Sequence, residues 1–107
     1  MVCFNERKIA SLRASVPASS TLAAATTRYK ALAHPVRLAI LAVLRVESCC
    51  VCDLANVLDV PVSTLSQHLK ALRQAGLVAS RQEGKLVFYS LMEDARRELR
   101  TVGAEST

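Results

Sequence analysis

The sequence predicts a mainly α domain with one small β-hairpin, arranged as a winged helix-turn-helix. Two short amphipathic helical patterns lie on either side of a Pro-containing turn at Asp59–Pro61. The second pattern stops at Gly76, the residue type that most often follows the end of a helix. Two β-prone runs, Leu77–Arg81 and Leu86–Leu91, come next and are joined by a Glu-Gly pair. This order of helix, turn, helix and hairpin predicts the winged arrangement.

The whole chain has the size and composition of one ordinary domain. Its 107 residues are 51% apolar, which argues against disorder. We expect a loosely structured N-terminal arm over residues 1–20, in which Ile9, Leu12 and Val16 have helical spacing before Pro17. A single domain with dimerising terminal helices follows over residues 21–107. No apolar run approaches the ~20 residues that cross a bilayer, and charged residues interrupt the first 20 residues. We therefore expect a cytoplasmic protein with no membrane partner.

The first two expected helices meet at a His-Pro pair. The first begins near Thr21, and its apolar residues have heptad-like spacing typical of a dimer contact. These residues are Leu22, Ala25, Tyr29 and Leu32. His34-Pro35 ends this helix because the residue before a proline avoids helical dihedrals. Pro35 then suits the first turn of a second helix, which runs to about Val46.

The next two expected helices form the helix-turn-helix. After a short connection over Glu47–Cys50, a third helix covers about Val51–Leu58. Ser63 is a candidate N-cap for a fourth helix over roughly Thr64–Ala75. The buried stripe of that helix comprises Leu65, Leu69 and Leu72.

The hairpin and a final helix complete the expected domain. The turn of the hairpin lies at Glu83-Gly84, where the glycine supplies a positive φ. The final helix begins near Met92 and repeats the heptad-like spacing. Its apolar positions are Met92, Ala95, Leu99 and Val102.

The outward face of the fourth helix carries side chains that suit DNA. Hydroxyls bond base edges or phosphates, glutamine suits adenine, and lysine neutralises a phosphate. The basic hairpin adds two cations, and the net charge of +5 suits a polyanion. A solvated polar face is the alternative, but the order and spacing of the elements favour DNA. The predicted contacts are Ser63, Thr64, Ser66, Gln67, Lys70, Arg81 and Lys85, with Gln74 on the same face. His68 borders the buried stripe, so we expect a structural role for it.

Three of the four cysteines, Cys49, Cys50 and Cys52, fall within four residues, and Cys3 lies far upstream. Cytosolic thiols stay reduced, so the cluster indicates a soft-ion or redox site rather than a disulfide framework. Residues two apart lie on opposite sides of a regular helix. Cys50 and Cys52 can therefore share an ion only at a distorted or unwound helix start. The alternative is that the three are small buried hydrophobic residues.

Four segments of the chain resemble the ArsR/SmtB family of metal- and metalloid-sensing repressors. They are ALAHPVRLAIL, CVCDL, STLSQHLKALRQAGLV and EGKLVFYSL, within Tyr29–Leu91. The resemblance implies a homodimer that holds double-stranded operator DNA without a cofactor and releases it when an effector binds. The CVCD string resembles that of the branches that sense arsenite and cadmium or lead. It implies a metal site among Cys3, Cys49, Cys50 and Cys52, with arsenite or antimonite as the effector and cadmium or lead as the alternative.

The chain departs from the arsenite branch at one position. The third cysteine of that branch corresponds to Ala55 here. Cys49 can substitute for it, or Cys3 can arrive from the arm, as an arm cysteine does in the cadmium/lead branch. The terminal helix contains no histidine, so we expect no zinc or nickel site there.

Three other classes of function are weaker. A thiol-redox-responsive repressor is the nearest, although a disulfide between adjacent cysteines is strained. An enzyme lacks support, because the chain has no Gly-rich phosphate loop and no nucleophile-base-acid set. Cys49 and Cys52 have Cys-x-x-Cys spacing, but the βαβ context of a thiol oxidoreductase is absent. An interaction module that binds protein and not DNA is the last alternative.

Overall fold

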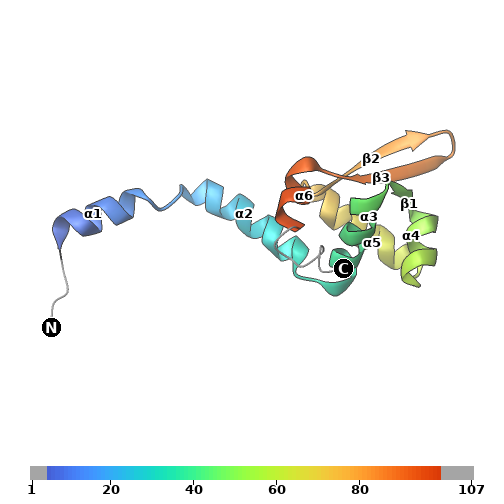
Figure 1. Cartoon of the computed structure of the whole chain (residues 1–107), viewed down its shortest axis with the longest axis horizontal. Coiled ribbons are helices and arrows are strands. Elements are labelled where there is room, and N and C mark those ends of the chain that lie inside the picture. Colours follow the sequence, from blue (N-terminus) through green and yellow to red (C-terminus); the bar gives the residue numbers. More distant parts are fainter. Residues whose placement is uncertain (1–4, 100–107) are drawn as a thin grey trace.

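The computed structural model describes residues 5–99, and within them the protein is mainly helical with one small sheet (Figure 1). The elements in chain order are α1 (Glu6–Ala14), α2 (Ser19–Leu32), α3 (Pro35–Val46), β1 (Cys49–Cys50), α4 (Val51–Leu58), α5 (Val62–Gln74), β2 (Val78–Glu83), β3 (Leu86–Leu91) and α6 (Glu93–Leu99). Helices α4 and α5 and the β2–β3 hairpin are the predicted helix-turn-helix and wing. One more helix precedes the wing than the four that we expected, because α1 forms within the arm.

The core is aliphatic and lies where α3, α4 and α5 meet the sheet. Its largest fully buried side chains are Ile40, Leu41, Leu44, Leu54, Leu65, Leu69, Leu72 and Leu77. The predicted stripe of α5 is therefore confirmed as its inward face. Each fully buried leucine contributes about 1.5–3 kcal/mol relative to an exposed one. This packing fixes which face of α5 is left for solvent.

Helix α3 begins as predicted, whereas α5 begins differently. His34 caps α3, where its Nδ1 accepts a hydrogen bond from the backbone N–H of Val36 at 3.1 Å. The prediction that Ser63 caps α5 is wrong. Pro61 occupies the cap position with φ −57°, and Ser63 lies inside the first turn. Proline has no N–H, so it leaves one donor fewer to satisfy at the helix start.

The sheet has three strands in the order β1-β3-β2, and all neighbours are antiparallel. The hairpin register pairs Glu83 with Leu86, which leaves Gly84 and Lys85 as its two-residue turn. The turn thus lies one residue later than predicted, with Gly84 at φ +62°. The expected connection before α4 is also partly wrong. Its last two residues form β1, which pairs Cys49 with Tyr89 on β3.

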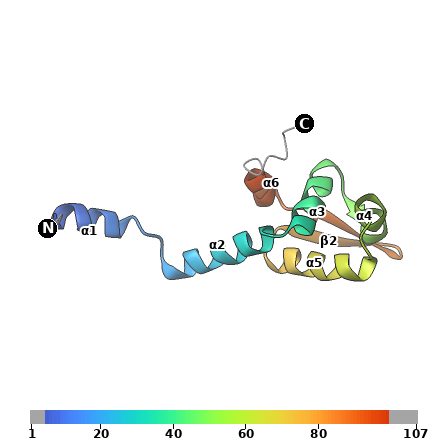
Figure 2. The same cartoon turned by 90° about the horizontal axis from the view of Figure 1, so that it is seen from below.

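The N-terminal arm, which we expected to be loosely structured, contains the helix α1. Asn5 starts α1, because its Oδ1 accepts a hydrogen bond from the backbone N–H of Lys8 at 3.1 Å. No residue of α1 is buried, and α1 stands away from the body at the end of α2 (Figure 2). This arrangement gives the molecule its longest dimension of 64 Å.

The two predicted heptad-like sets are mostly outside the core. In α2 only Ala31 and Leu32 are buried, whereas Tyr29 is 63% exposed and Leu22 is 45% exposed. In the second set, Ala95 is buried on α6, and the Leu99 side chain and Val102 lie outside the part of the chain described. None of the helices within residues 5–99 is long and apolar enough to cross a membrane.

Candidate nucleic-acid interface and thiol cluster

Helix α5 presents a polar face opposite its three buried leucines. Because successive residues turn by about 100° around a helix axis, the residues opposite the stripe fall on one face. We call this set the reader face, and it comprises Ser63, Ser66, Gln67, Lys70 and Gln74, all exposed. Thr64 is half-buried at its edge. The structure therefore brings together the predicted DNA contacts of this helix.

Two hydrogen bonds tie α5 to its neighbours, one on each flank of the reader face. On the wing side, Arg73 Nη1 donates to Ser80 Oγ on β2 at 3.1 Å. On the opposite side, Arg37 Nε, from α3, donates to His68 Nδ1 at 3.1 Å. Neither contact was predicted. The partners of the second lie 31 residues apart in the sequence, so no local pattern indicates it. Together the two bonds add to the leucine packing that sets the rotation of α5 about its axis.

His68 serves this arrangement as a neutral imidazole. Burial lowers its pKa, and the neighbouring His34 and Arg37 lower it further. The His34 and His68 rings lie in contact at an angle of 52°, with centroids 4.4 Å apart. An Nδ1 that accepts from a guanidinium must be unprotonated. The site therefore favours the uncharged form of His68, in a structural role.

The two predicted cations of the wing differ in their surroundings. Lys85 lies in the exposed hairpin turn, whereas Arg81 forms an ion pair with Glu83. Both partners stay more than half exposed, so the pair contributes little to stability. It nevertheless offsets the positive charge of Arg81. The sequence indicates this ion pair, because Arg81 and Glu83 are two positions apart and therefore lie on one face of β2.

Two of the clustered cysteines are buried, and the third is exposed. Cys49 and Cys50 form β1, and Cys52 lies in the first turn of α4. Cys50 is also the residue that begins α4, with extended dihedrals of φ −81° and ψ 166°. Cys50 and Cys52 therefore lie on either side of a helix start, which is one of the two geometries that a shared ion requires.

Cys49 differs from the other two in its surroundings. Its Sγ donates to the backbone oxygen of Glu47 at 3.4 Å. Burial raises the pKa of its thiol, and the charges of Asp53, Glu47 and Cys50 raise it further. The thiolate is the form that binds metal. Cys49 thus begins from a less favourable state as a ligand, and its role as one stays a prediction.

Residues 5–99 of one chain do not bring together a complete set of metal ligands. Among these residues, no three His, Cys, Asp or Glu side chains form a group that could hold a metal ion. Cys3 lies outside the described residues. Two soft sulfur donors at the start of α4 fit a soft ion in their chemistry. A third donor has to come from a rearrangement, from Cys3 or from another chain.

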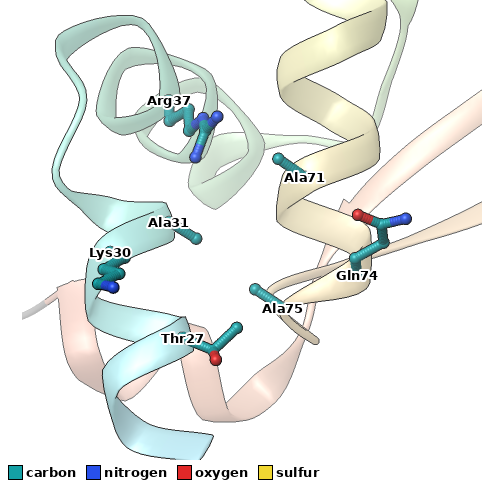
Figure 3. A pocket seen from close by; sticks show the side chains of 7 residues that line it. All are labelled: Thr27, Lys30, Ala31, Arg37, Ala71, Gln74 and Ala75. Atoms are coloured by element: carbon teal, nitrogen blue, oxygen red, sulfur yellow. The ribbon is translucent and has the colours of Figure 1, made fainter. Parts of the chain in front are cut away.

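Two open cavities flank the helices. A cavity of about 270 Å³ lies between α2, α3 and α5, as Figure 3 shows. It is lined by Thr27, Lys30, Ala31, Arg37, Ala71, Gln74 and Ala75. A second, of about 460 Å³, lies beside the end of α3 and is lined by Ala42, Val43, Val46, Glu47 and Cys49.

Comparison with known proteins places this geometry among regulators. The sequence profile of bacterial regulatory proteins of the arsR family matches residues 34–80. A cadmium resistance transcriptional regulatory protein CadC homolog from Staphylococcus aureus is 42% identical over 72 residues, which are 66% of this chain. The chain spans only 60% of that relative's length.

Solved structures extend the likeness to most of the chain. HlyU from Vibrio cholerae N16961 has a TM-score of 0.74 and 34% identity, over 80% of this chain and 95% of its own. The homodimeric winged helix-turn-helix DNA-binding domain of Mb0332 from Mycobacterium bovis has a TM-score of 0.75 and 30% identity, over 99% of this chain and 90% of that one. The winged helix-turn-helix prediction is thereby confirmed.

Proposed function

The chain belongs to the arsR family of bacterial regulatory proteins, and we propose that it is a cytoplasmic transcriptional repressor that a soft metal ion or metalloid releases from operator DNA. One observation carries the proposal: the thiol pair lies at the start of α4, the first helix of the helix-turn-helix. The family is one of DNA-binding regulators, so no enzymatic step is invoked.

The reader face supports the DNA-binding part of this proposal. Its hydroxyl, amide and ammonium groups suit base edges and phosphates in the major groove. Ser63, Gln67 and Lys70 are exposed on one side of α5, where their polar groups are accessible to DNA. The wing adds Lys85 for the adjacent backbone.

We also propose that the protein acts as a homodimer. Leu22 and Tyr29 form an exposed apolar surface on α2, and Met92 adds another where α6 begins. Burial of such surface against a second copy is the usual gain on dimerisation. The Mb0332 domain is itself described as homodimeric. Two copies would present two reader faces, which suits an operator with two half-sites.

We propose that Cys50 and Cys52 supply the first two donors to the effector. Trivalent arsenic or antimony would take a third sulfur, from Cys49 or Cys3. The name of the Staphylococcus relative favours cadmium as a second candidate, and lead has similar ligand preferences. All four ions select thiolate, which distinguishes them from zinc with its frequent histidine and carboxylate ligands.

Release would follow from the two structural roles of Cys50. Its backbone pairs with Phe88 on β3, the inner strand of the wing, and it also begins α4. Helix α4 packs on α5. An ion that draws Cys50 and Cys52 together would strain the β1–β3 pairing, the α4 start or both. Each ~1.4 kcal/mol of strain would weaken DNA binding about tenfold.

The test is a DNA-release titration with arsenite, antimonite, cadmium, lead and zinc in parallel. A duplex selected by the wild-type protein from a random-sequence pool serves as the operator probe. The double variant Cys50→Ser/Cys52→Ser should bind this duplex as the wild type does and fail to release it. Release of the double variant by the same ion would contradict the proposal.

Two further arms separate the alternatives. Cys49→Ala should retain release if Cys49 is not a ligand, and lose it if Cys49 supplies the third sulfur. Release by peroxide that a reductant reverses, without release by any ion, would favour a thiol-redox repressor instead.

A further inference from the structure

We propose that the cavity between α2, α3 and α5, here called the backbone trench, seats the DNA phosphodiester backbone on the side of the reader helix opposite the wing. The inference rests on the proposed DNA-binding function and adds a second backbone contact to it. Three features carry it, namely the position of the trench, its charge and its shape.

The trench borders the reader face along one flank. Gln74 belongs to that face and also lines the trench, and Ala71 and Ala75 follow it around the helix. The other flank of α5 faces β2 through Arg73. The reader helix is therefore bordered by the wing on one side and by the backbone trench on the other.

A helix in the major groove has a sugar-phosphate backbone along each flank. The groove is about 12 Å wide, and a helix with its side chains is about 10–12 Å across. One sugar-phosphate backbone therefore runs along each side of the inserted helix. The wing can hold only one of the two backbones. The trench lies where the other would pass.

The charge of the trench suits a phosphate. Lys30 and Arg37 are among its lining residues, and none of the lining residues within 5–99 is acidic. The bond to His68 uses Arg37 Nε and holds the guanidinium at the trench. Within residues 5–99, no carboxylate lies within ion-pair distance of Arg37, whereas Arg81 on the wing is paired with Glu83. The trench side thus offers the less compensated positive charge.

The shape of the trench allows close approach. Ala31 on α2 faces Ala71 and Ala75 on α5 across the opening, as Figure 3 shows. Small side chains on both walls leave the opening free. Arg37 extends toward it from α3, whereas the Lys30 side chain lies on the outer edge of α2. A phosphodiester backbone can therefore enter between the helices and meet Arg37 there, with Lys30 at the outer rim on α2.

The salt dependence of DNA binding tests the inference. Fluorescence anisotropy would follow binding of the selected duplex from about 50 to 200 mM salt, a range over which several phosphate contacts change the affinity by orders of magnitude. In Lys30→Ala, the slope of log K against log salt should fall by about 0.9, the value for one lost phosphate contact. Lys8→Ala on α1 removes the same charge away from the body and should leave the slope unchanged.

Arg37 needs a control for its contact with the reader helix. Arg37→Ala removes both the guanidinium and the bond to His68. His68→Ala removes that bond and keeps the guanidinium. The proposal expects a lower slope in Arg37→Ala and a wild-type slope in His68→Ala, with circular dichroism to verify folding of both. Equal slopes in these two variants, together with a wild-type slope in Lys30→Ala, would overturn it.

Phosphate ethylation interference locates the contact. Ethylation on the strand away from the wing should block wild-type binding and lose that effect in Lys30→Ala. Failure of the wild-type protein to select or bind any duplex would instead refute the proposed function, and with it this inference. In another outcome, the wild-type protein binds inorganic phosphate or another small anion through the trench, while Lys30→Ala keeps the wild-type slope for DNA. That result would assign the trench to a small ligand and overturn the proposal.

Discussion

Helices α4 and α5 are adjacent halves of one helix-turn-helix, but they are held very differently. Helix α5 has 13 residues with three fully buried leucines, and side chains tie it to α3 and β2. Helix α4 has 8 residues, one fully buried leucine, and an exposed Val57. Its start depends on a two-residue strand. The reader helix is therefore the rigid element, and the start of α4 is where a small force can produce a change.

The largest expected effect tests the rigid half of this comparison. Leu69→Ala removes a fully buried side chain from α5 and should lower the free energy of unfolding by about 2–5 kcal/mol. Val57→Ala, on the exposed side of α4, should change it by less than about 0.5 kcal/mol. Urea denaturation measures both. Similar losses in the two variants would mean that Val57 is packed as firmly as Leu69, against the exposure that the structure gives it.

The sequence predicts the rigid helix α5 better than it predicts β1 and the start of α4. The stripe of α5 repeats every three or four residues, and a His-Pro pair marks the start of α3, so local patterns were sufficient. The strand β1 is two residues long, too short for any alternation to show. Its existence depends on pairing with β3, about 40 residues further along the chain.

The site follows the same division. Polar residues of the reader face were predictable because one helix places them together. The Arg37–His68 bond was not, since it joins two helices. Likewise, the spacing of Cys50 and Cys52 indicated an irregular helix start, but only the strand explains it. The pairing of Glu83 with Arg81 follows from strand spacing, because residues two apart share one face of a strand.

An intermediate effect is expected at the other end of α4. Asp59 ends the helix in the left-handed region at φ +55°. Asp59→Ala should lower the free energy of unfolding by roughly 1 kcal/mol, because alanine is strained there. Asp59→Gly removes that strain, but glycine raises the conformational entropy of the unfolded chain. Its free energy of unfolding should therefore stay within about 0.5 kcal/mol of the wild type.

This pair of variants also sharpens where α4 yields. If an effector acts at the start of α4, Asp59→Gly should leave the concentration of ion needed for DNA release unchanged. A large shift in that concentration would place the movement at the end of the helix and not at Cys50.

The smallest expected effect concerns the tie between α3 and α5, and it appears as a pH dependence. The pKa of His68 is lowered from its ordinary value of 6.5, first by burial and then by His34 and Arg37. The folded protein thus binds fewer protons at this site than the unfolded chain, so stability rises with pH in this range. The contribution is fully present above about pH 6.5. It is lost as the pH falls from there through the lower pKa of the folded state.

Urea unfolding between pH 5 and 8 would measure this loss. In His68→Gln, the amide oxygen can still accept from Arg37 but cannot take up a proton. The variant should therefore keep a folded reader helix and show a flatter stability profile below about pH 6.5. An identical profile in wild type and variant would show that the histidine contributes no proton linkage. The rigidity of α5 would then rest on its buried leucines, with the tie to α3 serving only to set its rotation.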